Sequence, residues 1–199
     1  ARLGQALDAQ VPVRVLFEAS SVELLAARME SEIGSGARAA LTARVRPERV
    51  PLSLAQQRMW FLNRFDTLSS ANNIPVAIRL SGLLDVAALD AAVSDVVVRH
   101  EILRTVYPEV DGVGFQEVLS ADRVRLDLSP VAVSESDVVG AVTEFLSAGF
   151  DVAVEVPVRA RLFAVSESEF VLAMVVHHIS GDGVSMGPLT RDVMVAYEA

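Results

Sequence analysis

Two apolar runs joined by a short polar turn constrain the fold of this chain more than any other feature. Val158–Val165 and Phe170–Val176 consist almost entirely of apolar residues, and the four residues between them read Ser-Glu-Ser-Glu. Apolar runs of this length bounded by turn residues are typical of strands, and so short a connection makes the pair an antiparallel hairpin. The sequence therefore predicts a sheet that contains this hairpin.

Further strands and helices are predicted on both sides of the hairpin. Strands are expected at Ile74–Leu80, Leu103–Tyr107 and Gly114–Leu119, the last two around the turn Asp111-Gly112. Helices are expected at Ser53–Leu62, Asp85–Val98, Asp137–Ala148 and Leu189–Tyr197, with Ser53 and Asp85 as N-caps of the first two. Strands mixed with helices in this way predict an α/β or α+β fold with a mixed sheet.

Composition excludes several classes of function. The 199 residues carry a net charge of −9, which argues against binding nucleic acid or an anionic membrane surface. Absence of cysteine excludes disulfides, thiolate catalysis and Cys-ligated zinc. No apolar run approaches the roughly 18 residues of a membrane span, and the N-terminal ten residues lack a secretory hydrophobic region. A cytoplasmic protein is the simplest interpretation.

The chain divides by pattern into three parts. Residues 1–33 form short helices and are too few to bury a core alone. Residues 34–50 have small residues followed by arginines and a proline, hold no hydrophobic period, and are the expected linker. Residues 51–199 carry the predicted sheet and its helices.

Two of only three histidines, His177 and His178, stand side by side where the last predicted strand ends. Successive side chains of a strand point to opposite faces, so the two rings are not expected to share one metal ion, and no metal is predicted. Two interpretations stay open. Both histidines can be satisfied by hydrogen bonds in the core, or one can act as a general base in a cleft formed by the glycine-containing turn around Asp182.

Three motifs resemble those of condensation domains in nonribosomal peptide synthetases. His177-His178-Ile-Ser-Gly-Asp182-Gly183 matches HHxxxDG, Ser53–Leu62 matches SxAQxRxWFL, and Arg99–Thr105 matches RHExLRT, in the family's order. The resemblance covers residues 51–199. It implies a fold similar to a lobe of chloramphenicol acetyltransferase, and this chain looks like the N-terminal lobe of two. Trp60, Phe61 and Leu62 of the first motif are expected in the core.

The N-terminal part resembles the last helices of a peptidyl carrier domain. The stretch from Val11 to Arg28 carries this resemblance. The serine that bears phosphopantetheine would then lie upstream of residue 1, so the implied cofactor sits on carrier domains and no residue of this chain is nominated to bind it. The implied partners are the upstream and downstream carrier domains, the second lobe of the condensation domain, and adenylation domains of the same synthetase.

The resemblance also implies roles for individual residues. His177, His178, Asp182 and Gly183 form the catalytic motif, with His178 as the base or hydrogen-bonding group for the attacking amine and Gly183 as an oxyanion donor. Asp182 is expected to be structural, through an ion pair with an arginine. Arg104 and Arg99 are the local candidates for that pair, and an arginine of the second lobe is the alternative.

The implied activity is peptide-bond formation, in which an upstream donor thioester is transferred onto the amine of a downstream carrier-bound residue. Heterocyclisation domains replace the histidines with aspartates, which this chain lacks. Two alternatives remain: a noncatalytic scaffold of the same fold that binds carriers or tailoring enzymes, and an acyltransferase acting on a free small molecule. The presence of His178 and Gly183 favours catalysis over the scaffold, although the fragment alone can be inactive whatever its parent does.

Overall fold

The computed structural model describes residues 11, 13–19, 21–30, 42 and 45–199, which fall into two compact units, Ala1–Arg46 and Pro47–Ala199. The first unit contains helices α2 (Val13–Glu18) and α3 (Val22–Met29). Ser21 is the N-cap of α3, and its side chain accepts a hydrogen bond from the N–H of Leu24. Most of the expected linker, residues 34–50, lies outside the described residues.

The predicted hairpin is the centre of the main sheet of the second unit. Its strands, β7 (Val158–Ala164) and β8 (Glu169–His177), are antiparallel. The other strands are β2 (Asn73–Ser81), antiparallel to β8, and β6 (Val131–Ala132), parallel to β7, giving the order β2-β8-β7-β6. The expected mixed sheet is therefore confirmed.

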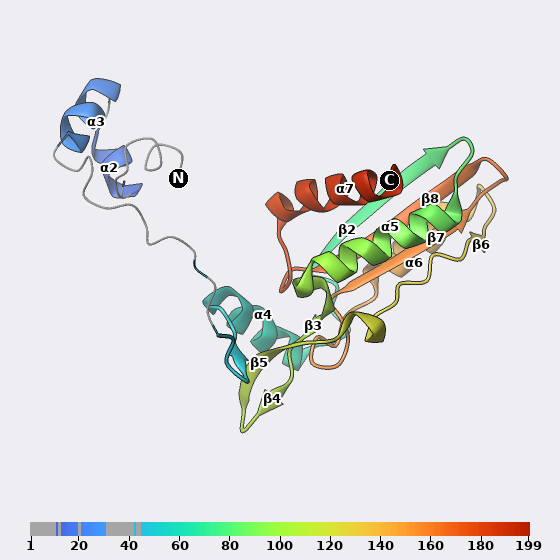
Figure 1. The fold of residues 1–199 in the computed structure, drawn as a ribbon, viewed down its shortest axis with the longest axis horizontal. Coiled ribbons are helices and arrows are strands. Elements are labelled where there is room, and N and C mark those ends of the chain that lie inside the picture. Colours follow the sequence, from blue (N-terminus) through green and yellow to red (C-terminus); the bar gives the residue numbers. More distant parts are fainter. Residues whose placement is uncertain (1–10, 12, 20, 31–41, 43–44) are drawn as a thin grey trace. The chain divides into compact units, whose positions relative to one another are not determined.

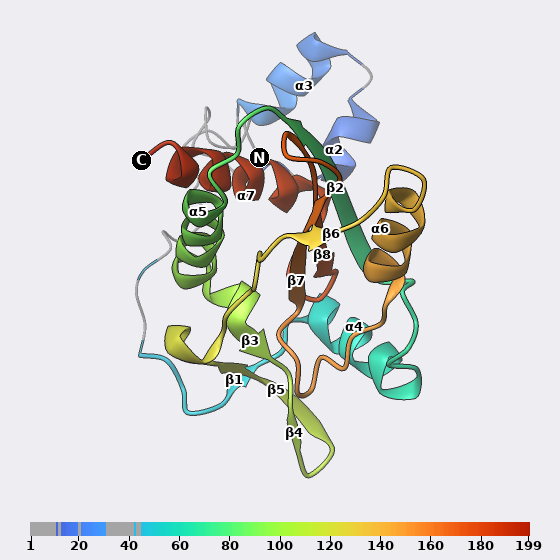
Figure 2. The ribbon, with the colours of Figure 1, turned by 90° about the vertical axis from the view of Figure 1, so that its right-hand side faces the viewer.

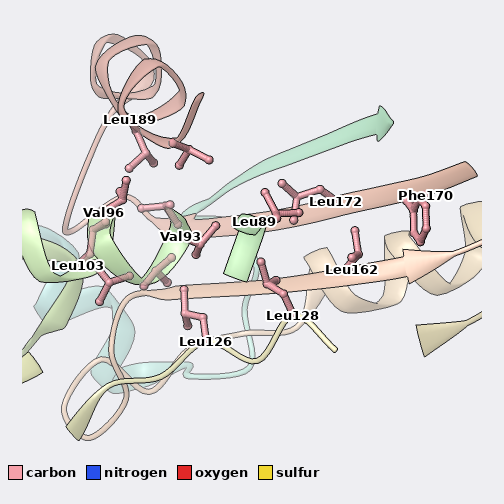
Figure 3. Packing of buried hydrophobic residues seen from close by; sticks show 14 residues of the cluster. Leu89, Val93, Val96, Leu103, Leu126, Leu128, Leu162, Phe170, Leu172 and Leu189 are labelled. Atoms are coloured by element: carbon pink, nitrogen blue, oxygen red, sulfur yellow. The ribbon is translucent and has the colours of Figure 1, made fainter. Parts of the chain in front are cut away.

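Helices cover both faces of this sheet, as Figure 2 shows. On one face lie α5 (Val86–Arg99) and α7 (Gly183–Tyr197), and on the other lies α6 (Val138–Ser147). Asp85 caps α5, as predicted, by accepting from the N–H of Ala88. Leucines and valines of α5, α7, β7 and β8 form the largest buried cluster, part of which is drawn in Figure 3. No helix among the described residues combines the length and hydropathy that crossing a membrane requires.

A second, smaller group of elements lies at one end of the main sheet (Figure 1). It contains α4 (Leu54–Phe65), β1 (Val50–Pro51), β3 (Thr105–Val106), β4 (Glu109–Val110) and β5 (Val113–Val118), with the single-turn helices η1 (Glu101–Arg104) and η2 (Ala121–Arg123). The strand predicted from Leu103 begins two residues later because η1 takes the first part of that segment. Asp111 and Gly112 form the predicted turn, with φ angles of 54° and 78°, the left-handed conformation that two-residue hairpin turns require.

Helix α7 begins at Gly183, six residues before the predicted start at Leu189. The sequence Gly183 to Pro188 contains two glycines and a proline, which argue against a helix on propensity. A capping box at Asp182 and Ser185 overrides that preference by satisfying the first N–H groups of the helix.

Helix α4 buries a polar side chain and leaves several of its apolar side chains exposed. Ser53 caps it, as predicted, in a capping box with Gln56. Its buried residue is Asn63, whereas Phe61 is 56% exposed, Leu62 48% and Phe65 75%. The expectation that Phe61 and Leu62 lie in the core is wrong, because hydrogen bonds of the helix occupy the inward face. Of the three motif residues, only Trp60 packs against a buried cluster.

We expect Gly149→Ala to destabilise the protein. A Cβ at Gly149 would lie 2.2 Å from the carbonyl oxygen of Thr67 and 2.7 Å from the Cα of Leu68, so backbone has to move. The expected cost is about 1–3 kcal/mol in the free energy of unfolding measured with urea. Gly140→Ala in α6 is the matched control. Its Cβ meets nothing within 4 Å, and it should be neutral or stabilising; equal effects of the two changes would contradict the packing at Gly149.

Candidate active site

The two histidines occupy different environments at the end of β8. His177 is the last residue of the strand and is 1% exposed, with its ring edge-on to Phe150 at a centroid distance of 5.9 Å. His178 follows immediately and is exposed. This agrees with the expectation that the rings point to opposite sides of the strand. Of the two, only His178 is open to a substrate.

His177 is held as a neutral hydrogen-bond acceptor. Its Nδ1 accepts the backbone N–H of Ile179 at 3.1 Å, so the proton of the neutral ring sits on Nε2. Burial, with a smaller contribution from the charge of His178, lowers the pKa of His177 to about 4. The backbone N–H of His177 donates to the carbonyl of Pro157 at 2.9 Å. His177 therefore shapes the segment that follows it and does not exchange protons near neutral pH.

The segment His178–Asp182, called the histidine loop below, is held at both sides of its backbone. The N–H of His178 donates to the carbonyl of Asn72 at 2.8 Å. Two side chains from distant segments, the amide of Gln56 and the hydroxyl of Tyr107, each reach the carbonyl of Ile179 at 3.5 Å. Because the loop is held by other elements, the position of His178 is set by the fold as a whole.

Two further residues of α4 support this arrangement indirectly. Trp60 Nε1 donates to the carbonyl of Tyr107 at 2.9 Å. Asn63 donates to the carbonyl of Phe150 at 2.7 Å and accepts from the N–H of Val152 at 3.2 Å. Trp60 of the first motif and Asn63, which directly follows that motif, thus bind the backbone of the two aromatic residues that contact the histidine segment.

Sequence reasoning missed Tyr107. It is fully buried, and burial raises the pKa of its hydroxyl. A tyrosine at the end of an apolar strand needs a hydrogen-bond partner for its hydroxyl when buried, and that requirement was the available signal. The partner itself, the carbonyl of Ile179, lies 72 residues further along the chain.

Asp182 is a helix cap and has no ion pair with the expected arginines. Its carboxylate accepts from the N–H of Ser185 at 2.9 Å and from the Ser185 hydroxyl at 2.7 Å. These hydrogen bonds are the main cause that lowers the pKa of Asp182, and the charge of His178 adds to them. The structural role predicted for Asp182 therefore rests on capping α7.

The arginines expected to pair with Asp182 are engaged elsewhere. Arg104 donates to the carbonyl of Leu119 and lies 3.5 Å from the carboxylate of Glu101. Arg99 lies 3.2 Å from the carboxylate of Asp192, on α7. Among the described residues the proposed Asp182–Arg104 and Asp182–Arg99 pairs are absent, because both guanidinium groups find nearer acceptors around the end of α5.

The space next to the Cα of Gly183, at the start of α7, is open. Gly183 is the first residue of the helix, where N–H groups have no acceptor within the helix. A Cβ built at Gly183 would meet nothing within 4 Å. The residue therefore presents an uncrowded helix N-terminus beside the loop that carries His178. In the described part of the chain, no group of three or more His, Cys, Asp or Glu residues is placed to hold a metal ion.

The site thus lies in an α/β lobe with a mixed sheet: a central strand ends in a buried histidine, an exposed histidine follows it, and a short loop leads to a capped helix. The sequence model of the condensation domain family matches residues 47–199 of this chain. The chain therefore belongs to the condensation domain family.

Curated relatives are large synthetases. The chain is 42% identical over 198 residues to a dimodular nonribosomal peptide synthase of Bacillus subtilis, a match that covers all of this chain and 8% of that protein. It is 46% identical over 196 residues to the probable non-canonical nonribosomal peptide synthetase CymA of Salinispora arenicola, covering 98% of this chain and 2% of that protein. The chain thus spans a small fraction of either relative.

Solved structures of the same fold fall into two groups. The X-domain from teicoplanin biosynthesis is 43% identical, with a TM-score of 0.74 over 80% of this chain and 34% of that chain. The X-domain in its complex with OxyB matches equally well, at a TM-score of 0.75. The starter condensation domain of rhizomide synthetase RzmA is 17% identical, with a TM-score of 0.66 over 76% of this chain and 38% of that chain, a likeness of fold alone.

The pKa of His177 predicts how stability depends on pH. The pKa of His177 is about 4 in the folded chain, and its ordinary value, expected in the unfolded chain, is 6.5. At pH values between these two, the unfolded chain binds more protons than the folded chain. Stability is then fully present above pH 6.5 and falls as the pH drops, by about 2 kcal/mol from pH 7 to pH 5. Urea unfolding at several pH values measures this slope.

Two substitutions separate the histidines in that measurement. His177→Gln should be less stable at pH 7 but should lose most of the slope between pH 7 and pH 5. His178→Gln, at the exposed neighbouring position, should keep the slope of the wild type. An unchanged slope in His177→Gln would show that another group titrates.

The capping role of Asp182 predicts different thermal stabilities for two substitutions of this residue. Asp182→Ala removes the acceptor for Ser185 and should lower Tm by a few degrees. Asp182→Asn keeps a side-chain oxygen as acceptor, and Asn and Asp are about equally good N-cap residues, so the Tm of this variant should stay close to that of the wild type. Thermal unfolding measures both. If the charge of Asp182 is needed for an ion pair, the Asn variant will be as unstable as the Ala variant.

Proposed function

We propose that this chain is the N-terminal lobe of a condensation domain that forms peptide bonds in nonribosomal peptide synthesis. The observation that carries the proposal is the exposed ring of His178, held on a loop fixed from several sides and next to the open space at Gly183. The synthetases related to this chain support the same function. A synthetase of this kind works in the cytoplasm.

The reaction places the acceptor amine beside His178. The amine nitrogen attacks the carbonyl carbon of the donor thioester, the C–N bond forms, the C–S bond breaks, and the thiolate leaves as the amine loses a proton. His178 accepts that proton or hydrogen-bonds the amine, and a general base in such a position contributes about 10²–10⁴-fold. The N–H of Gly183, at the first position of α7, suits an oxyanion donor for the tetrahedral intermediate.

His177 and Asp182 serve this chemistry by position. His177 has its Nδ1 occupied by Ile179 and a pKa of about 4, so it is a poor proton carrier at neutral pH. Asp182 uses its carboxylate to begin α7 at the end of the loop. Arg104 and Arg99 support the elements around the site through Leu119, Glu101 and Asp192.

Carrier domains deliver the substrates in this proposal. The phosphopantetheine arm, when loaded on a carrier, supplies the thioester whose carbonyl is attacked, and the uncrowded side of Gly183 fits the approach of such an arm. Residues 1–33 are the end of the upstream carrier, followed by the linker 34–50 and the lobe 51–199. The downstream carrier, the second lobe and the adenylation domains are the other partners.

A noncatalytic scaffold is the second candidate. The 43% identity to an X-domain, a domain solved in complex with OxyB, supports it. So do the exposed apolar residues of α4, since a row of exposed apolar side chains marks a protein contact surface. The complete HHxxxDG motif, with His178 accessible, favours the catalytic function over this one.

Intact-protein mass spectrometry of the synthetase module tests the catalytic function. The donor carrier of the module is loaded with the donor acyl group, and a loaded acceptor carrier is added. Transfer of the acyl group to the acceptor is then measured over time. We expect wild type to transfer and His178→Ala to lose about 100-fold or more, with unchanged thermal unfolding. His178→Gln, which keeps a hydrogen-bonding group but no basic nitrogen, distinguishes a base from a hydrogen-bond donor.

The outcomes are distinct. Equal rates for wild type and His178→Ala would mean that positioning of the two substrates suffices and that His178 has no chemical role. Absence of transfer by wild type with matched substrates, together with capture of a tailoring enzyme, would establish the scaffold instead.

A further inference from the structure

The carboxylate of Asp192, on α7, lies close to the side chains of Arg99, His100 and Arg191. The Nε2 of His100 lies 2.8 Å and the Nε of Arg99 lies 3.2 Å from the same carboxylate oxygen, Oδ2. Arg191 lies 3.5 Å from the other oxygen. The side chain of Asp192 is 14% exposed, and its pKa is lowered, chiefly by the hydrogen bond from His100. Its neighbours stabilise it as an anion.

This carboxylate joins the second motif to the helix that follows the histidine loop. Arg99 is the last residue of α5 and His100 is its C-cap, both in RHExLRT. Asp192 lies on α7 ten residues after Asp182, the cap at the other end. At a rise of about 1.5 Å per residue, Asp192 lies about 15 Å along α7 from Asp182, where the histidine loop ends.

The first part of α7 depends on such an anchor. Gly183 and Gly187 weaken the helix, and Pro188 offers no N–H to the carbonyl of Val184. The fully buried residues of α7 begin at Leu189, which packs with Val93 and Val96 of α5 (Figure 3), and before it only Met186 packs, partly buried, against the same cluster. Apolar packing alone permits sliding and rotation, whereas charged hydrogen bonds have direction, so they set the register of α7 on α5.

We propose that Asp192 is a positioning residue of the active site, which holds α7 in register with the RHExLRT segment and thereby places Gly183 and His178. Arg99 and His100 of the second motif then influence the position of the histidine loop through their contacts with Asp192, and not through an ion pair with Asp182. The proposal concerns the same site as the proposed function and rests on it for its catalytic consequence.

The test uses the synthetase module with its carriers and the change Asp192→Asn, which keeps the size of the side chain and removes its charge. Glu198→Gln is the control, an exposed carboxylate at the C-cap of the same helix. We expect the transfer rate at saturating acceptor carrier to fall about tenfold in Asp192→Asn, with the KM for that carrier unchanged, and to stay at the wild-type value in the control.

Hydrogen exchange provides a readout that does not depend on activity. Backbone amides of residues 178–186 should exchange about tenfold faster in Asp192→Asn than in wild type, while β7 and β8 keep their protection. His100→Ala removes a donor to the same carboxylate and should give the same pattern. The double change should be no worse than the more severe single change, because both break one interaction.

Unchanged exchange of residues 178–186 in both single variants overturns the proposal, whatever the transfer rates. Wild-type protein that transfers no donor, combined with faster exchange in the variants, overturns the proposed function and leaves Asp192 as the anchor of α7. If Asp192→Asn does not fold, His100→Ala decides by the same exchange measurement.

Discussion

The active-site arrangement depends on one short piece of backbone, the peptide groups on either side of Ile179. Its N–H is bound by the buried ring of His177, and its carbonyl is reached by Gln56 and Tyr107. A loop with one bound peptide group can still pivot about it. With donor and acceptor both engaged by groups from three separate elements, the loop has one orientation, and His178 is presented from it at a defined place. Pre-organisation of this kind lets a single imidazole act without reorganising the site.

The difference between two adjacent histidines follows from strand geometry. Consecutive side chains of β8 point to opposite faces, so one ring is buried beside Phe150 and the other is exposed. Burial disfavours the charged form of His177. The ring therefore stays neutral, and its Nδ1 accepts a backbone N–H within the core. The same residue type thus provides a structural group and a chemically available group one position apart, and the strand alone decides which is which.

Local signals in the sequence were sufficient for much of the fold. Alternation and apolar runs predicted β2, β7 and β8, and the caps Ser53 and Asp85 predicted the starts of α4 and α5. Local signals failed where they competed: Gly183, Gly187 and Pro188 argued against a helix that the capping box at Asp182 nevertheless begins. They also failed where a partner is far away in the chain. The acceptor of Arg99 is 93 residues distant, and neither spacing nor periodicity distinguishes Asp192 from Asp182 as its partner.

Helix α4 shows how the requirements of the site shape the surface. Its inward face is used by Gln56, Trp60 and Asn63, whose polar groups bind the backbone around the histidine segment. Hydrogen bonds to buried backbone need polar side chains in the interior. Met59 and Trp60 also pack inward, whereas Leu54, Phe61 and Phe65 remain on the outside. Exposing them is unfavourable in water, and a contact with another protein surface would remove that cost. Helix α4 thus binds the backbone around the histidine loop from its inward face and leaves an apolar face available for contact with another protein surface.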